Sequence, residues 1–132
     1  MSDTDVDDTE TTRSLVHEWQ RLLARHAAVS GALEHELQAR HGIGVNEFEA
    51  LERLVEGEDG RCRLQELTDA LPLTQSAASR LVARMEREGL VNRAMCDADR
   101  RGIFVCLTDA GRERYLAARP TQRAVLAATL RD

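Results

Sequence analysis

The sequence predicts one mostly α-helical domain that carries a small β-sheet wing of two or three strands. The chain has 132 residues, of which 42% are hydrophobic, and this is enough for one core but too few for two. Only 3% of the residues are aromatic, so leucine, valine, alanine and methionine must fill that core, which favours packed helices over stacked sheets. Helical apolar spacing covers most of the chain, and an alternating pattern is confined to residues 90–107.

The N-terminal region divides into a tail and a long helix. Residues 1–10 are acidic and hydroxylated with a single valine, so we expect a disordered acidic tail. From about Thr11, apolar residues recur at three- and four-residue steps and predict a helix that stops near His41 and Gly42. The stripe consists of Leu15, Trp19, Leu22, Val29, Leu33 and Leu37. A stripe this long needs a partner, so we assign residues 11–44 to an N-terminal dimerisation helix.

Three shorter helices are expected between residues 45 and 89. In the first, Asn46 and Glu49 make a candidate capping box, and the buried face consists of Phe48, Leu51, Leu54 and Val55. The second is about two turns long, is built on Leu64, Leu67 and Leu71, and must end before Pro72. Thr74 can cap the third, whose core face holds Ala78, Leu81, Val82 and Met85 before Gly89 closes it. The last two helices form a tight helix-turn-helix corner.

The third of these helices has a polar face that its core does not need. Side chains there can hydrogen-bond to base edges or phosphates: Thr74, Gln75, Ser76, Ser79, Arg80 and Arg84. A solvated helix surface is the alternative for each of them, and Arg84 could pair with Glu88 one turn later. The composition of this face favours a DNA-recognition helix.

A hairpin and a final helix complete the chain. Leu90 to Cys96 and Ile103 to Leu107 predict two strands, and the polar tip between them predicts a turn. Arg100 and Arg101 on this tip suit a narrow, electronegative minor groove, and ordinary hairpin-tip charges are the alternative. For Asp97 and Asp99 we favour charge balancing over an acid-base pair. Thr108 is expected to cap the last helix, which Pro120 interrupts before a second apolar segment of Val125, Leu126 and Leu130.

Charge and cysteine usage narrow the function. The net charge is −5, but residues 1–60 hold fourteen acids and five arginines whereas residues 61–132 hold nine acids and thirteen arginines. The half that contains the helix-turn-helix is therefore basic, as a nucleic-acid partner requires. Three unclustered cysteines, Cys62, Cys96 and Cys106, predict free thiols, and no apolar run or basic leader indicates a membrane span or secretion. We expect a cytoplasmic protein without membrane contact.

Candidate chemical sites are weak. His17-Glu18 and His35-Glu36 begin like a metalloprotease motif, but Arg21 and Ala39 stand where the second histidine would be. A metal site using His35, His41 and nearby glutamates, or a redox role for a cysteine, would need geometry that sequence does not specify. With no nucleophile-base pair and no phosphate loop, we expect neither an enzyme nor a metal or cofactor.

The order of elements, taken with two stretches of sequence, resembles the MarR family of bacterial regulators. Residues 73–91, LTQSAASRLVARMEREGLV, resemble that family's recognition helix and its glycine-ended exit. Residues 97–101, DADRR, and residues 107–111, LTDAG, resemble its wing and the step after it. The similarity extends over residues 11–120 and is strongest between Val45 and Gly111.

The resemblance implies a winged helix-turn-helix over residues 45–111 and a C-terminal dimerisation helix over residues 112–132, shorter than the family's usual one. It also implies a homodimeric repressor that binds a near-palindromic operator in double-stranded DNA. Arg101 would enter the minor groove and Asp99 would steady the wing tip. A small aromatic or phenolic ligand could bind near His17, Trp19 and His26, although core packing is the alternative for Trp19. The alternative function is a winged-helix protein-interaction module that binds no operator.

Overall fold

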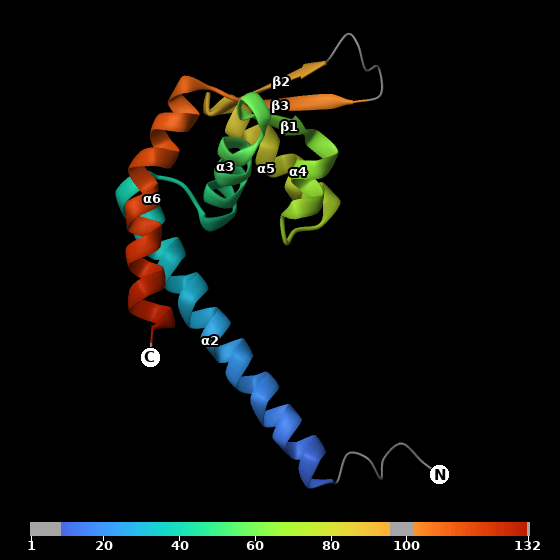
Figure 1. Ribbon diagram of the computed structural model, residues 1–132, viewed down its shortest axis with the longest axis vertical. Helices are drawn as coiled ribbons and strands as arrows, with labels where there is room; N and C mark the ends of the chain where they lie inside the picture. The colour runs from blue at the N-terminus through green and yellow to red at the C-terminus, as the bar shows by residue number, and fades with distance from the viewer. Residues whose placement is uncertain (1–8, 96–101, 132) are drawn as a thin grey trace.

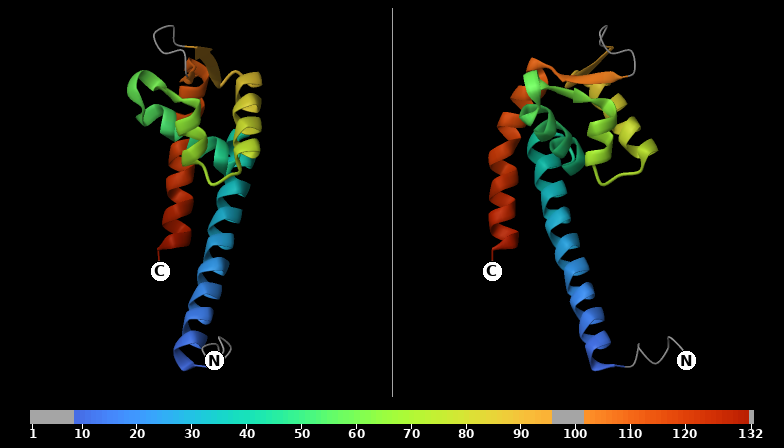
Figure 2. Two further views of the ribbon diagram at one scale, coloured as in Figure 1. Left: turned by 90° about the vertical axis from the view of Figure 1, so that its right-hand side faces the viewer. Right: turned by 45° about the vertical axis from the view of Figure 1, so that its right-hand side comes forward.

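The chain folds into a head of short elements and a stalk of two long helices (Figure 1). The structure is a computed structural model, and it describes residues 9–95 and 102–131. In chain order its elements are α2 (Glu10–His41), α3 (Val45–Glu56), a 3₁₀ turn (Glu58–Gly60), β1 (Arg61–Arg63), α4 (Leu64–Ala70), α5 (Gln75–Arg87), β2 (Val91–Met95), β3 (Ile103–Leu107) and α6 (Asp109–Leu130). The stalk consists of α2 and α6, and α2 projects well past the end of α6 (Figure 2).

The predicted long helix is confirmed, with clear signals at both of its ends. Thr9 Oγ1 accepts a hydrogen bond from the Thr12 amide at 3.0 Å, which satisfies one of the free amides of the first turn. Gly42 ends the helix with a left-handed backbone, φ 68°, and its amide donates to the Gln38 carbonyl. Because glycine adopts this conformation without a steric penalty, the helix stops here and the chain turns into the head.

The capping box predicted for α3 is wrong by two residues. The helix begins at Val45, with Gly44 as its N-terminal cap, so Asn46 lies inside the first turn. The carboxylate that reaches back belongs to Glu47, whose Oε1 accepts from the Gly44 amide at 2.8 Å. A glycine cap has no side chain to reveal it in the sequence, and a buried glutamate at the third helical position does the capping alone.

A three-stranded antiparallel sheet with the order β1-β3-β2 closes the head. The hairpin of β2 and β3 was predicted, and Val91 pairs with Leu107 at its base. β1 was not predicted; it pairs with β3, with Cys62 opposite Val105. Val91 and Val105 face the core, so this sheet forms a lid over the helices and not an independent layer.

One core joins the head to the stalk. The predicted inner faces of α3 and α5 are buried, except for the half-buried Val55, and they pack against Leu37, Ile43 and Leu90. The Tyr115 ring of α6 stacks on Phe48 with centroids 5.2 Å apart. Gly111 allows α6 to approach closely, because a Cβ at that position would overlap the Leu90 carbonyl group. The core therefore extends beyond the helix-turn-helix into both long helices.

Pro120 does not interrupt the last helix, which corrects the prediction. α6 runs without a break from Asp109 to Leu130. Pro120 is exposed, whereas Ala118 and Gln122 on either side of it are buried. The carbonyl that loses its proline partner therefore lies on the solvent side, where water can satisfy it, and packing on the buried face holds both halves together.

Polar contacts fasten α6 to the rest of the chain. Glu52 Oε2 accepts hydrogen bonds from the Tyr115 hydroxyl and from Arg123 Nη2, both at 2.7 Å. At the C-terminal end of α6, Arg25 near the middle of α2 donates to the Leu130 carbonyl at 2.6 Å. Within the described ranges no helix has the length and apolar character needed to cross a membrane.

Candidate nucleic-acid interface

The helix α5 has the cap and the core face that the sequence predicts. Thr74 Oγ1 accepts from the Ala77 amide at 3.1 Å, so this hydroxyl stabilises the helix start. Ala78, Leu81, Val82 and Met85 are all buried. The predicted polar residues are all exposed: Thr74, Gln75, Ser76, Ser79, Arg80 and Arg84. The structure thus leaves their side chains accessible to a partner.

The outward face of α5 also includes a residue that the sequence analysis missed. Arg87 follows Arg80 by seven residues and is exposed. Side chains seven positions apart lie on the same face of a helix, so Arg80 and Arg87 form one basic row with Ser76. The i, i+7 spacing could have identified Arg87, but its place next to the terminal Glu88 and Gly89 made it look like part of the helix end.

Arg84 lies on the flank of α5 that faces α3. Its Nε is 3.8 Å from Glu47 Oε2, so its observed acidic neighbour belongs to a different helix from the Glu88 considered in the sequence. The pKa of the Glu47 carboxyl lies above its ordinary value, mainly because the group is buried. The hydrogen bond from the Gly44 amide lowers this pKa, the nearby Glu88 raises it, and the Arg84 charge lowers it.

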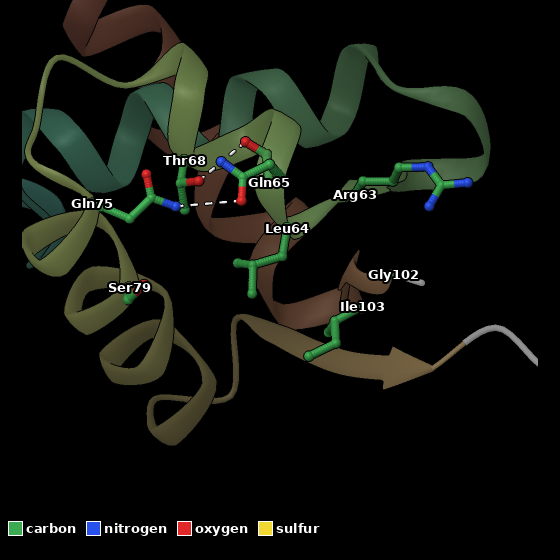
Figure 3. Close-up of a pocket in the computed structure, with 8 residues that line it drawn as sticks. All are labelled: Arg63, Leu64, Gln65, Thr68, Gln75, Ser79, Gly102 and Ile103. Atoms are coloured by element: carbon green, nitrogen blue, oxygen red, sulfur yellow. Dashed lines mark hydrogen bonds between the residues drawn. The ribbon is translucent and has the colours of Figure 1, made fainter. Parts of the chain in front are cut away.

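A pocket of about 250 Å³ lies between α4, the start of α5 and the wing, meaning the β2–β3 hairpin. Figure 3 shows Gln75 at one end of this pocket and Arg63 at the other, with Leu64 and Ile103 between them. The Gln75 amide donates to Gln65 Oε1 at 3.4 Å, which links the two helices of the corner. Polar groups thus lie at both ends of an apolar floor, on the side of the head that carries α5 and the wing.

The base of the wing adds two arginines that were not identified from the sequence. The guanidinium groups of Arg61 and Arg63 lie 4.8 and 5.2 Å from the centre of the Phe104 ring. Such cation-π contacts keep an arginine in place without neutralising its charge. Both residues belong to β1, and a three-residue strand is too short to show a clear alternating pattern.

The wing is tied to α5 through its first strand, β2. Arg93 Nε donates to Glu86 Oε1 at 2.9 Å, and the Arg93 amide also faces this carboxylate. This pair fixes the hairpin relative to the helix across their exposed surface. The predicted tip residues Asp97, Asp99, Arg100 and Arg101 lie outside the described residues.

The three candidates for ligand binding do not form one cluster. His17, Trp19 and His26 are all exposed on the projecting part of α2. Trp19 and His26 are seven residues apart and share a face, whereas His17 lies about half a turn away. Trp19 is 59% exposed, so the core-packing alternative is wrong within this chain.

Metal and thiol chemistry gain no support in the part of the chain that the structure describes, and Cys96 lies outside it. Among residues 9–95 and 102–131, no three histidines, cysteines or acids are grouped as metal ligands would be. His41, one of the suggested ligands, instead shares a 2.7 Å hydrogen bond with the Thr121 hydroxyl of α6. Burial raises the pKa of the Cys62 thiol, with Glu66 and Cys106 adding to the effect, and this direction disfavours the reactive thiolate form.

The chain was compared with known protein families and solved structures. The MarR family model matches residues 41–102. AbsC, a MarR family transcriptional regulator from Streptomyces coelicolor with a solved structure, is 32% identical to this chain. The alignment covers 92% of this chain and 79% of AbsC, with a TM-score of 0.82. Sco3205, a MarR family regulator from the same organism solved in complex with DNA, is 29% identical over 92% of this chain and 74% of Sco3205, with a TM-score of 0.82.

A MarR family regulator from Silicibacter pomeroyi is 26% identical over 94% of this chain and 85% of the other, with a TM-score of 0.75. No curated protein sequence shows significant similarity to the chain. The predicted winged helix-turn-helix fold, mostly helical with a small antiparallel sheet, is confirmed by these structures. The chain therefore belongs to the MarR family, whose members are transcriptional regulators and not enzymes.

Proposed function

We propose that this regulator binds duplex DNA with α5 in the major groove and the wing in the adjacent minor groove. The observation that carries the proposal is the exposed row on α5, where Ser76, Arg80 and Arg87 share one face beside the wing. Hydroxyl and guanidinium groups can donate hydrogen bonds to base edges and phosphates. The similarity to Sco3205, which was solved in complex with DNA, supports DNA as the partner.

We propose that the active form is a two-fold homodimer. The support is the projecting part of α2, on which Leu15, Val16, Trp19, Leu22 and Leu23 are exposed. Monomeric proteins rarely leave such a continuous apolar stripe in water, and a second copy would cover it. Two recognition helices related by this symmetry would meet half-sites about 34–36 Å apart in a near-palindromic operator.

Repression in the cytoplasm and response to a small aromatic ligand complete the proposal. Trp19 and His26 share a face that the second copy would cover, so we place the proposed ligand site at the dimer interface of the stalk. Trp19 is the one tryptophan of the chain, so its fluorescence reports binding there directly. Titration with benzoate should quench this fluorescence and weaken DNA binding over the same concentration range. Quenching without any change in DNA affinity would separate the ligand site from regulation.

The test of DNA binding starts with selection of duplexes from a random-sequence library by the purified protein. Arg80→Ala should cost about 1–3 kcal/mol of binding free energy on the selected duplex and relax the preference at one base position. Arg13→Ala, at the far end of α2 and 68% exposed, removes the same charge and should have little effect. If wild type retains no duplex, the protein-interaction alternative is favoured; an unchanged affinity for Arg80→Ala would remove Arg80 from the interface.

A further inference from the structure

The junction between α3 and α5 contains a buried charge that the fold does not require. The Glu47 side chain is only 5% exposed. Its Oε1 caps α3 by accepting from the Gly44 amide. Within the described structure its Oε2 is buried and has no hydrogen-bond partner. A buried carboxylate oxygen without a hydrogen bond is costly, and the cap of α3 uses only the other oxygen.

Two charged side chains at the C-terminal end of α5 lie near the Glu47 carboxyl: Glu88, which raises its pKa, and Arg84, which belongs to the proposed DNA-binding surface. Arg84 Nε lies 3.8 Å from Glu47 Oε2, beyond hydrogen-bond range but close enough for a strong Coulomb attraction. The Arg84 side chain is 50% exposed, in contrast to Glu47. This contact is made by the inner nitrogen of the guanidinium, and a guanidinium has two further terminal nitrogens that can donate to another partner.

Such an arrangement matters for recognition. A free arginine side chain samples many rotamers, and ordering one at an interface weakens binding by about 2- to 10-fold. A carboxylate that holds the inner edge of the guanidinium in the free protein removes part of this cost before DNA arrives. Because Glu47 itself is buried, it cannot repel the phosphates by direct contact, and α3 holds it rigidly through the Gly44 cap.

We propose that Glu47 is a positioning residue for DNA recognition, which holds the Nε edge of Arg84 so that its terminal nitrogens face the duplex. The inference rests on the proposed function, since it needs Arg84 to contact DNA. Glu47 acts through Arg84 and touches no nucleotide. The carboxylate therefore contributes to affinity only when the arginine is present.

A double-mutant cycle on the selected duplex tests this dependence. Glu47→Gln keeps an oxygen that can accept from Gly44 and removes the charge; because burial already raises the pKa of this carboxyl, a neutral group is tolerated there. Glu47→Gln should weaken binding about 3- to 10-fold in the wild-type background and have no effect in the Arg84→Ala background. Glu49→Gln removes the same charge from α3 at a half-buried position near Arg123 and should be neutral in both backgrounds.

The outcomes separate positioning from structure. Equal losses from Glu47→Gln in both backgrounds would mean that Glu47 only seats α5, and unchanged or tighter binding would also overturn the proposal. If the wild-type protein selects no duplex from the library, the proposed function itself is refuted. Arg84→Lys gives a check in which Glu47 is unchanged: lysine keeps the charge but has no Nε edge, so it should weaken binding about as much as Glu47→Gln does. Affinity near wild type would contradict positioning.

Discussion

The two halves of α2 share one apolar stripe and have opposite environments. Near its C-terminal end, Leu33 and Leu37 are buried, and Leu37 is only 1% exposed. Toward the N-terminus, the same helical face presents Leu15, Trp19 and Leu22 to solvent. Figures 1 and 2 show the reason: α6 and the head lie against the first region, and nothing in the described chain lies against the second.

This contrast shows what apolar periodicity reports. A repeat of three and four residues states which face of a helix is buried, because only that face can exclude water along its whole length. It does not state which element does the burying. In α2 the repeat continues without a break past the point where the chain's own cover ends, and this continuity supports a second copy as the remaining cover.

The largest expected effect comes from truncating the stripe where the chain covers itself. Leu37→Ala should lower the free energy of unfolding by about 2–5 kcal/mol, because it leaves a cavity in the core that joins α2 to the head. Leu22→Ala, on the same face of the uncovered half, should have a much smaller effect on the monomer. Urea denaturation at several protein concentrations measures both. Equal, concentration-independent losses would mean that the two halves are not different.

The next effect concerns assembly. Trp19→Ala should raise the dimer dissociation constant by about 10- to 100-fold, since a tryptophan at an interface buries more apolar area than most side chains. Gln20→Ala changes an adjacent exposed residue that lies off the stripe, and it should leave the dimer dissociation constant unchanged. Sedimentation at micromolar concentration measures both variants against wild type. A wild-type chain that sediments as a monomer would contradict the dimer proposal and would not affect the assignment of the winged-helix fold.

Much of this fold could be predicted because local signals agreed with the final packing. Thr74 and Thr108 cap the helices that they were expected to cap, and the core faces of α3 and α5 followed from spacing. The errors share a cause: tertiary packing outweighed a local rule. Pro120 lies inside α6 because the buried neighbours hold the helix, and α3 starts at Val45 because Glu47 reaches back from a buried position.

The candidate site was predicted only in part for a related reason. Its polar residues on α5 could be identified as those the core does not need. Arg61 and Arg63 could not, because their role at the wing base depends on β1 pairing with a strand more than forty residues later and on the Phe104 ring. The partner of Arg84 was also hidden, since Glu47 is distant in sequence and only the fold brings it near.

A smaller effect should come from the contacts that hold α6 in place as the cover of α2. Burial would raise the pKa of the Glu52 carboxyl, but the hydrogen bonds from Arg123 and Tyr115 outweigh it and hold the pKa below its ordinary value. A lowered folded pKa means that the ionised carboxylate stabilises the fold above the unfolded pKa. This contribution is lost as pH falls from about 5 through the folded value.

Glu52→Gln should therefore cost about 1 kcal/mol of unfolding free energy at pH 7, and the difference from wild type should shrink as the carboxylate protonates. Glu36→Gln, which removes a surface pair with Arg40 inside one helix, should cost less and serves as the control. Thermal unfolding between pH 3 and pH 7 gives both curves. A gap between Glu52→Gln and wild type that widens toward low pH would contradict the assigned contacts.

The smallest expected effect is at Gly31, between the covered and the uncovered halves of α2. Gly31 is exposed, and a Cβ there would meet no atom within 4 Å. Gly31→Ala should raise the free energy of unfolding by about 0.5–1 kcal/mol, because alanine loses less backbone entropy in a helix interior. Gly111→Ala is the opposed control: it too lies in a helix, but its Cβ would overlap the Leu90 carbonyl group, so it should destabilise. If Gly31→Ala also destabilised, another surface would have to pack against the outer side of α2 at this point, and the stripe of Leu15, Trp19 and Leu22 would not be the only face of the stalk that a second copy covers.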